Sequence, residues 1–349
     1  MYKLFILIFL TFECLGQSGL ESVDLSFNAL ERLKLSKDIA DLKQRNFRLD
    51  KELKNYHGVI TCEKSKFKVI FSIHGDLHKH WRDERKSFDI KIKSQGTCYG
   101  MKNFSLVRAD DKHSELEVLG QRLSKRLNLF HRKIKLINLI VNKKKHENYL
   151  IYEKITPDAL EHNGLSGAFI IGQNNSWKLG LVSSESSISS PFMDKDIKDS
   201  INSHKLVFYS ARPNLENFNA LSQWKFFLNS FNPEYINLDD FVSYLTIVSI
   251  TGSYHSVIID NLRWIYRPWT GKFSPIYYDT IPQLLPKSFE NHLNEIKRLN
   301  FLASKVLQAQ TTSYWLAKIK QKVLLLEGHL LNDHYFPIQQ NLEMIKSWK

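Results

Sequence analysis

The spacing of apolar and polar residues changes near residue 190, where mostly strand-like spacing gives way to mostly helical spacing. Before that point, short segments alternate or run apolar over the length of a strand, and glycines such as Gly75 and Gly96 separate them. Strands are expected at residues 68–74, 87–93, 102–107, 134–142, 148–155, 168–171 and 177–182. The lysine-rich turn 142–145 predicts that two of these strands form a hairpin.

Helical spacing, with apolar residues three and four positions apart, occurs on both sides of that point. In the first half it covers 26–56 and 114–127. After the serine-rich stretch Ser183–Ser190, helices are expected at 215–229, 238–249, 289–327 with one or two breaks, and near residue 339. Two strand-like pieces, 261–266 and 273–278, interrupt them and are joined by the turn 268–271.

These elements predict an α+β fold with an antiparallel β-rich N-terminal lobe and a helical C-terminal lobe. We expect a signal sequence over residues 1–16, an amphipathic helical linker over 17–56 and the β-rich lobe over 57–190. The α-rich lobe, which carries the hairpin with the candidate site, is expected over 191–349.

The first residues indicate export to the periplasm, the cell surface or the medium. Lys3 precedes the apolar run Leu4–Phe12, and Cys14 and Gly16 supply small residues before a cut after Gly16. A retained signal anchor is the alternative, and it would be the protein's one contact with a membrane. A lipoprotein signal fits less well, because Phe12 and Glu13 stand where small residues are needed.

Composition narrows the class of protein and the kind of partner. The 349 residues are 43% hydrophobic and 24% charged, as in folded globular proteins. Lysine and arginine number 49 against 36 acidic residues, a formal net charge of +13 that favours a polyanionic partner. We do not expect nucleic acid, because no recognised motif of interleaved aromatic and basic residues is present. Lysine runs such as Lys143–Lys145 are more typical of a solvated surface.

Cysteine and histidine positions leave two questions open. Cys62 and Cys98 remain after the signal is removed, so a disulfide is allowed but not required. His74, Asp76, His78 and His80 alternate and would share one face of an extended chain, as a zinc site needs. A polar loop with solvent-facing histidines explains the same pattern, and we do not expect a metal there.

The densest group of chemically capable residues lies between Gly252 and Asp279. Glycine-rich phosphate loops are absent, so any phosphate site must be built from side chains. The hairpin 261–278 would bring His255, Asn261 and Asp279 together, and amide and carboxylate oxygens suit Mg²⁺. In the alternative interpretation Asp279 caps the next segment and Asn261 makes a turn.

Five stretches match a known family in that family's order over about 57–285, and they are 75–76, 86–91, 100–106, 149–153 and 252–279. On these stretches the sequence resembles the CotH kinase family of atypical kinases, named for a spore-coat protein, and most closely its exported bacterial branch. The resemblance implies a small two-lobed, kinase-like fold that binds ATP with unusual exposure. It also implies a metal ion held by the aspartate that ends the Pro-Ile-x-x-Asp strand.

On this resemblance Asp279 corresponds to the metal-binding aspartate, and Asn261 to the asparagine that helps to hold the phosphate-bound metal. Glu153 would end a strand beside the nucleotide. Lys86, Lys102 and Lys154 are the candidates for gripping phosphates.

One departure concerns the catalytic base. The family commonly has an aspartate at the position of Ser253, and a serine hydroxyl cannot accept the proton of the phosphate acceptor at neutral pH. Asp260 is the candidate substitute, so the catalytic candidates are Asp260, His255 and Ser253.

The leading hypothesis is ATP- and Mg²⁺-dependent phosphoryl transfer to a hydroxyl of a surface protein or polysaccharide. The alternative is a catalytically inactive pseudokinase, or a scaffold that binds an anionic polymer of the cell envelope through its basic surface.

Overall fold

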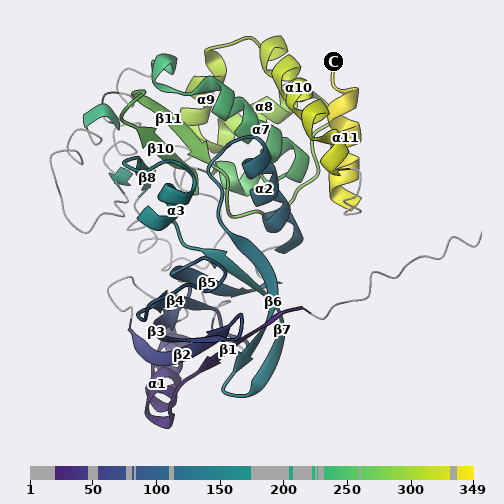
Figure 1. Ribbon diagram of the computed structural model, residues 1–349. Helices are drawn as coiled ribbons and strands as arrows, with labels where there is room; N and C mark the ends of the chain where they lie inside the picture. Colours follow the sequence, from purple (N-terminus) through teal and green to yellow (C-terminus); the bar gives the residue numbers. More distant parts are fainter. Residues whose placement is uncertain are drawn as a thin grey trace, which may run out of the picture.

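A strand-rich N-terminal region and a helical C-terminal region make up the mixed α+β structure (Figure 1). The computed structural model describes residues 20–45, 54–75, 81, 84–109, 114–173, 204–206, 222–224, 226, 232–258, 261–330 and 336–349. The coarse division expected from the sequence is therefore confirmed. The expected signal sequence, the strand at 177–182 and the serine-rich stretch lie outside the described residues, as does most of the helix expected at 215–229.

Seven strands form the N-terminal sheet. They are β1 (Ser22–Ser26), β2 (Tyr56–Cys62), β3 (Ser65–Ile73), β4 (Phe88–Ile92), β5 (Asn103–Arg108), β6 (Ile134–Val141) and β7 (Lys144–Glu153). Their order is β1-β2-β3-β4-β5-β7-β6, and parallel pairing of β1 with β6 closes the sheet into a barrel. The expected antiparallel pairing is therefore present except between β1 and β6, whereas a closed barrel differs from the β-rich lobe of a protein kinase.

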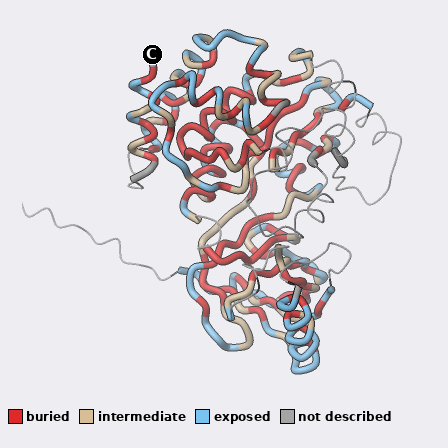
Figure 2. Tube along the Cα trace, turned by 180° about the vertical axis from the view of Figure 1, so that it is seen from behind, coloured by how far each residue is buried: buried red, intermediate tan, exposed pale blue. Residues whose placement is uncertain are grey.

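The closing strand β1 lies inside the segment that we expected to be a helical linker. It is only five residues long, and its two fully buried residues, Val23 and Leu25, alternate with more exposed ones, as in a strand with one face on the core. Helix α1 (Ala29–Arg45) follows it and buries Leu35, Ile39 and Leu42 in the same core as the barrel. Figure 2 shows the rest of this helix as mostly exposed.

The hairpin expected around the lysine turn is present as β6 and β7. Asn142 and Lys143 form its turn, with φ angles of 47° and 72°. Two successive left-handed residues match the type I′ turn, whose twist suits a two-residue hairpin. Lys144 and Lys145 therefore belong to the strand β7, whereas the sequence placed them in the turn.

A second, four-stranded sheet belongs to the C-terminal region. Its order is β11 (Lys272–Ile276), β10 (Arg263–Arg267), β8 (Phe169–Gln173), β9 (His204–Leu206). β8 falls within the range 57–190 of the expected N-terminal lobe, yet Ile170 pairs with Ile265 of β10. The hairpin of β10 and β11, with its turn ending at Gly271, has the form expected from the sequence.

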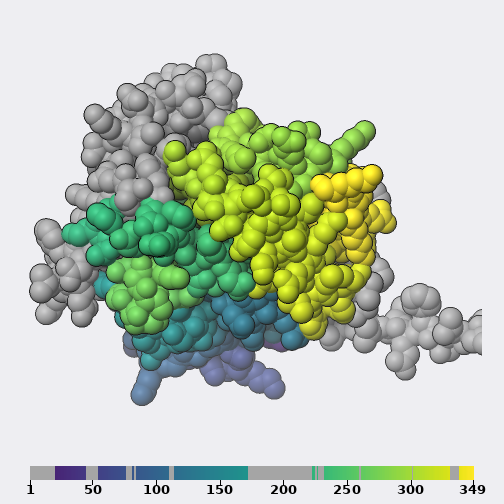
Figure 3. Space-filling model, turned by 90° about the horizontal axis from the view of Figure 1, so that it is seen from above, coloured from purple at the N-terminus to yellow at the C-terminus, as the bar shows by residue number. Residues whose placement is uncertain are grey.

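Helices build most of the C-terminal region around the buried α7 (Leu238–Thr251). The others are α3 (Pro157–His162), α8 (Phe289–Leu299), α9 (Phe301–Gln308), α10 (Thr312–Leu330) and α11 (Phe336–Ser347), with short 3₁₀ helices η6 (Pro233–Tyr235) and η7 (Tyr254–Val257). Residues of α8 to α11 cover much of the face seen from above in Figure 3. Among the described helices, none combines the length and the apolar character needed to cross a membrane.

Helix α2 (Ser114–Arg126) joins the two regions, although it lies between strands of the barrel in the sequence. Its residues Leu116, Leu119 and Leu123 belong to the same core as α7, whereas Val118 packs against Leu150 and its buried neighbours on the barrel. A movement of either region would therefore change the contacts of α2.

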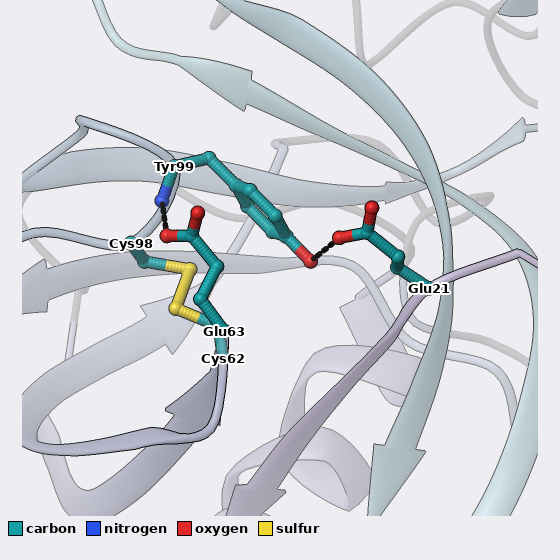
Figure 4. Close-up of a disulfide and its surroundings, with 5 residues drawn as sticks. All are labelled: Glu21, Cys62, Glu63, Cys98 and Tyr99. Carbon is teal, nitrogen blue, oxygen red and sulfur yellow. Dashed lines mark hydrogen bonds between the residues drawn. A yellow bond between two sulfur atoms is a disulfide. The ribbon is translucent and has the colours of Figure 1, made fainter.

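A disulfide joins Cys62, at the end of β2, to Cys98, in the loop before β5, with 5.8 Å between the Cα atoms (Figure 4). This decides the question that the sequence left open. Tyr99 fixes the loop further, because its backbone N–H donates to Glu63 and its phenol donates to Glu21, each at 2.8 Å. The loop is thus tied both to the hairpin of β2 and β3 and to the start of β1.

Candidate functional site

Asp279 lies three residues beyond the end of β11, in an unusual backbone conformation. Its φ angle is 62°, in the left-handed region that non-glycine residues seldom adopt, although aspartate and asparagine do so more readily than others. Such conformations gather at functional sites, where the surrounding structure holds them in place. The carboxylate is partly exposed, and its Oδ2 lies 3.1 Å from Nε2 of His255.

His255 connects Asp279 to Asn261. His255 lies in η7, after the end of α7, and its carbonyl accepts a hydrogen bond of 3.0 Å from Nδ2 of Asn261. Asn261 lies two residues before β10 and Asp279 three residues after β11, so the hairpin returns both residues to one end. The structure thus places the imidazole of His255 against the carboxylate of Asp279, and the amide of Asn261 against the backbone of His255.

Helix α2 holds the residue after Asp279. Oε2 of Glu117 accepts two hydrogen bonds from Thr280, one from the backbone N–H at 3.0 Å and one from the hydroxyl at 2.8 Å. The other oxygen, Oε1, accepts from Nη2 of Arg132 at 2.6 Å, and Glu117 and Arg132 are both buried. The buried ion pair of Glu117 with Arg132 therefore holds the backbone of Thr280, next to Asp279, in place.

Two glycines allow the same segment to approach its neighbours closely. A Cβ on Gly120 of α2 would lie 2.0 Å from the ring of Tyr277. Gly252, at the end of α7 with φ of 64°, accepts a hydrogen bond from the backbone N–H of Gln283, and a Cβ there would lie 1.9 Å from the carbonyl of Gln283. The segment from Tyr277 to Gln283 is thus held against both helices.

Ser253 supports this segment from within the core. Its side chain is fully buried, and its Oγ accepts a hydrogen bond of 3.2 Å from the backbone N–H of Ile281. A substrate hydroxyl could not reach it there. Asp260, the other candidate base, lies outside the described residues.

Glu153 is separate from this group and ends β7 in a buried position. The backbone N–H of Lys133 donates to its Oε2 at 3.3 Å, and Nδ1 of His162 lies 3.4 Å from Oε1. Burial raises the pKa of Glu153 to about 7, although the charges of Lys133 and Arg132 oppose the shift. The carboxyl group therefore exchanges a proton near neutral pH, as acid–base groups do.

The structure distinguishes the three candidate lysines. Lys154 pairs with Asp89 of β4, with 2.9 Å from Nζ to Oδ2. Lys86 is half-buried near Glu84 and His146, close to the start of β7. Lys102 is exposed and forms no ion pair within the described part of the chain. Lys154 is therefore the one held beside a carboxylate on the barrel.

Asp89 organises a polar cluster around Lys154. Its Oδ1 contacts Nδ1 of His74 at 2.8 Å and the hydroxyl of Ser105 at 2.6 Å. Burial opposes ionisation of Asp89, but His74, Lys154 and Ser105 outweigh it and hold its pKa well below the usual range. Nε2 of His74 lies 3.2 Å from the phenol of Tyr152.

His74 was one of the four residues whose alternation would suit a zinc site, and in the structure it pairs with Asp89. Asp76, His78 and His80 lie outside the described residues. Among the residues that are described, no group of three or more histidine, cysteine or acidic side chains is placed to hold a metal ion by itself. Asp279 and Asn261 offer Mg²⁺ two oxygen donors, which suits an ion that takes its other ligands from water and phosphate.

Sequence reasoning missed Glu117, Arg132 and Thr280. A signal for the first was present, because Glu117 and Gln121 follow one another at helical spacing beside the apolar stripe of α2. Both are buried. Nothing in the sequence pointed to Arg132 or Thr280, since each is identified only by its contact with Glu117.

Comparison with known proteins leaves the resemblance to the CotH kinases as a prediction. No family model matches the chain, and no curated protein matches it significantly.

Proposed function

We propose that the protein is a CotH-like, ATP- and Mg²⁺-dependent phosphotransferase that acts on a hydroxyl of a surface protein or polysaccharide. The observation that carries the proposal is the group of His255, Asn261 and Asp279 at one end of the hairpin. In the reaction the γ-phosphoryl group passes to the acceptor oxygen, ADP leaves, and the acceptor proton passes to a base, for which Asp260 is the candidate.

The proposed roles follow from what phosphoryl transfer requires, which is positioning and stabilisation of charge. Asp279 and Asn261 would hold Mg²⁺, and the ion supplies charge neutralisation on the phosphates. His255 orients the carboxylate of Asp279 through their 3.1 Å contact. Glu117 keeps the backbone beside Asp279 in place through Thr280.

The remaining candidates take supporting roles in the proposal. Lys154 is the preferred phosphate-gripping lysine, because Asp89 holds its ammonium group in one place. In protein kinases an ion pair between a strand lysine and a helix glutamate, and an aspartate that binds Mg²⁺, must both be in place. Asp279 after β11 is proposed for the second role, whereas Glu117 on α2 pairs with Arg132 and does not supply the first. On the basis of Asp279 we propose a small two-lobed, kinase-like arrangement in which the barrel takes the place of the β-rich lobe.

Thermal unfolding in the presence of ATP and Mg²⁺ tests the proposal. A ligand at 100 times its Kd adds about 2.7 kcal/mol to the stability of the protein that binds it. Asp279→Asn should abolish this gain but keep the fold, because asparagine tolerates the left-handed backbone as aspartate does. The matched control is Asp239→Asn, an exposed carboxylate on α7, which should leave the gain unchanged.

The results separate the hypotheses. If Asp279→Asn binds ATP and Mg²⁺ as tightly as the parent protein, the metal site is misassigned. If neither protein binds nucleotide, the phosphotransferase proposal fails and the scaffold is favoured.

A second candidate, a nucleotide-binding pseudokinase, is supported by the burial of Ser253. A side chain that is fully buried and bonded to Ile281 cannot act as the missing base. Ser253→Asp should therefore destabilise the protein, because it would bury a charge, and should not restore activity. Transfer of labelled phosphate from ATP by the parent protein, lost in Asp260→Asn, would contradict the pseudokinase.

Export is part of the proposal, and the disulfide between Cys62 and Cys98 supports it, because such bonds persist in oxidising compartments. N-terminal sequencing of the protein from its native cells should find a new terminus after Gly16 or a membrane-retained Met1. An intact Met1 in the cytoplasm would contradict it.

A further inference from the structure

The outer face of β3 and β4 carries four lysines in two neighbouring rows. Lys66 and Lys68 alternate with buried residues along β3, and Lys91 and Lys93 do so along and just beyond β4, and all four lysines are exposed. Because side chains two positions apart share a face, the lysines of each row lie about 6.6 Å apart. The two rows belong to adjacent strands, which are about 4.8 Å apart.

The register places two of the lysines directly side by side. The pairing of β3 with β4 matches Val69 with Ile92, and the backbone N–H of Lys93 continues it by donating to the carbonyl of Lys68 at 2.8 Å. Like charges opposite one another on adjacent strands destabilise a sheet. The arrangement therefore costs the isolated protein stability, which a bound anion would offset.

The neighbours of the lysines on the adjoining strands carry no charge. They are Val59 and Thr61 on β2 and Asn103 on β5. Asp89 shares the outer face of β4 with Lys91, but its carboxylate is engaged by Lys154 and His74. Within the described part of the chain, no salt bridge joins any of the four lysines to an acidic residue.

The face lacks the features that two other kinds of polyanion require. No large hydrophobic side chain protrudes from β3 or β4 among the exposed ones of the described chain, so there is nothing to insert into a lipid surface. Its outward residues on these strands include no tryptophan, tyrosine or phenylalanine, on which nucleic-acid bases would stack. Two parallel rows of ammonium groups fit a linear polymer whose repeating units carry the charge.

We propose that the outer face of β3 and β4 binds a linear phosphate polymer that lies along the two rows of lysines. A phosphate group at the centre of the surface would meet Lys68 and Lys93 together, and groups on either side would meet Lys66 or Lys91. This binding is independent of the phosphotransferase proposal, because none of the four lysines belongs to the group around Asp279.

Binding of fluorescently labelled inorganic polyphosphate, followed by fluorescence anisotropy at several salt concentrations, tests the proposal. Four lysine contacts predict a slope of about −3 for log K against log salt, which is about a 60-fold loss of affinity between 50 and 200 mM salt. The test variant carries Lys66→Gln, Lys68→Gln, Lys91→Gln and Lys93→Gln. It should lose this salt dependence and the affinity that accompanies it.

A charge-matched variant separates this surface from the overall positive charge. It replaces four exposed lysines on other faces, Lys37, Lys43, Lys272 and Lys318, with glutamine. This variant should bind as the parent does and melt at the parent temperature, because the replaced side chains are exposed. The test variant should melt at or above the parent temperature, because it removes the repulsion between Lys68 and Lys93.

Three results would overturn the proposal. The first is an equal loss of affinity in both variants, which would assign binding to net charge alone. The second is unchanged binding in the test variant. The third is tighter binding of single-stranded DNA or of anionic lipid vesicles than of polyphosphate, with the same loss in the test variant, which would give the surface to a different polyanion.

Discussion

Replacing Glu117 with glutamine removes one charge from the centre of the contact between α2 and the segment that carries Asp279. The side chain accepts from Arg132 on one oxygen and from two donors of Thr280 on the other, and it is buried. Glutamine keeps one oxygen and turns an amide group toward the other set of donors. Either Arg132 or Thr280 must therefore lose its acceptor.

The magnitude follows from which partner is lost. If the amide turns toward Arg132, the buried guanidinium loses both its counter-charge and its acceptor, which typically costs 3–5 kcal/mol. If the amide turns toward Thr280, Arg132 keeps a neutral acceptor and a buried backbone N–H is left unsatisfied, which costs about 1–3 kcal/mol. The variant will adopt the cheaper arrangement, so we expect Glu117→Gln to lower the free energy of unfolding by about 2–3 kcal/mol.

Urea unfolding followed by tryptophan fluorescence measures this change, since Trp264 and Trp315 are buried in the C-terminal core. Glu115→Gln is the matched control: the residue lies in the same first turn of α2 but is exposed. Glu115→Gln loses the same interaction with the helix dipole, so it should lower the free energy of unfolding by no more than about 1 kcal/mol. A loss below about 1 kcal/mol in Glu117→Gln, or equal losses in both variants, would refute the reasoning.

Three further predictions concern stability. Replacing Cys62 and Cys98 with serine opens a cross-link that spans 36 residues and should cost about 4 kcal/mol, measured by urea unfolding; no difference between the oxidised parent and the variant would contradict a disulfide. Burial lowers the pKa of His292 to about 3 from its ordinary 6.5, so the ring stays neutral in the folded protein. The protein therefore loses stability as the pH falls below 6.5, where the unfolded chain takes up a proton at this ring. The loss should reach about 2 kcal/mol at pH 5 and be absent from His292→Gln, and an identical pH dependence in that variant would rule this residue out as its source. Gly252→Ala should cost at least about 2 kcal/mol, because it places a Cβ in the left-handed region against the carbonyl of Gln283; a melting temperature equal to that of the parent would contradict the contact.

The protonation state of His292 illustrates how local contacts fix a buried group. Ser249 donates its one hydroxyl proton to the carbonyl of Leu245 at 2.8 Å, so it must accept from Nε2 of His292, 3.0 Å away. Nδ1 is then the acceptor for the hydroxyl of Tyr254. A neutral ring satisfies both bonds. A second ring proton on Nδ1 would require the hydroxyl of Tyr254 to give up its donated bond and accept instead.

Local patterns in the sequence determined most of the secondary structure. The hairpin of β10 and β11 lies where spacing and turn residues indicated it. The helical segment expected at 289–327 with one or two breaks has two, between α8 and α9 and between α9 and α10, although the sequence did not indicate their positions. These features depend on residues within a few positions of one another. The hairpin also placed Asn261 and Asp279 at one end before any packing was known.

Contacts between distant residues decided the rest. Closure of the barrel requires Val23 to pair with Leu139, and the alternation of a five-residue strand is too short to reveal such a partner. The assignment of β8 to the second sheet depends likewise on a partner almost 100 residues away in the sequence.

The site divides in the same way. Sequence alone selected Asp279, because its chemistry and its place after a strand are local properties. Only the tertiary structure showed that Ser253 is buried and that Glu117 holds Thr280, 163 residues further along the chain. Burial and hydrogen-bond partners are set by every element packed around a side chain, so no single segment of the sequence contains them.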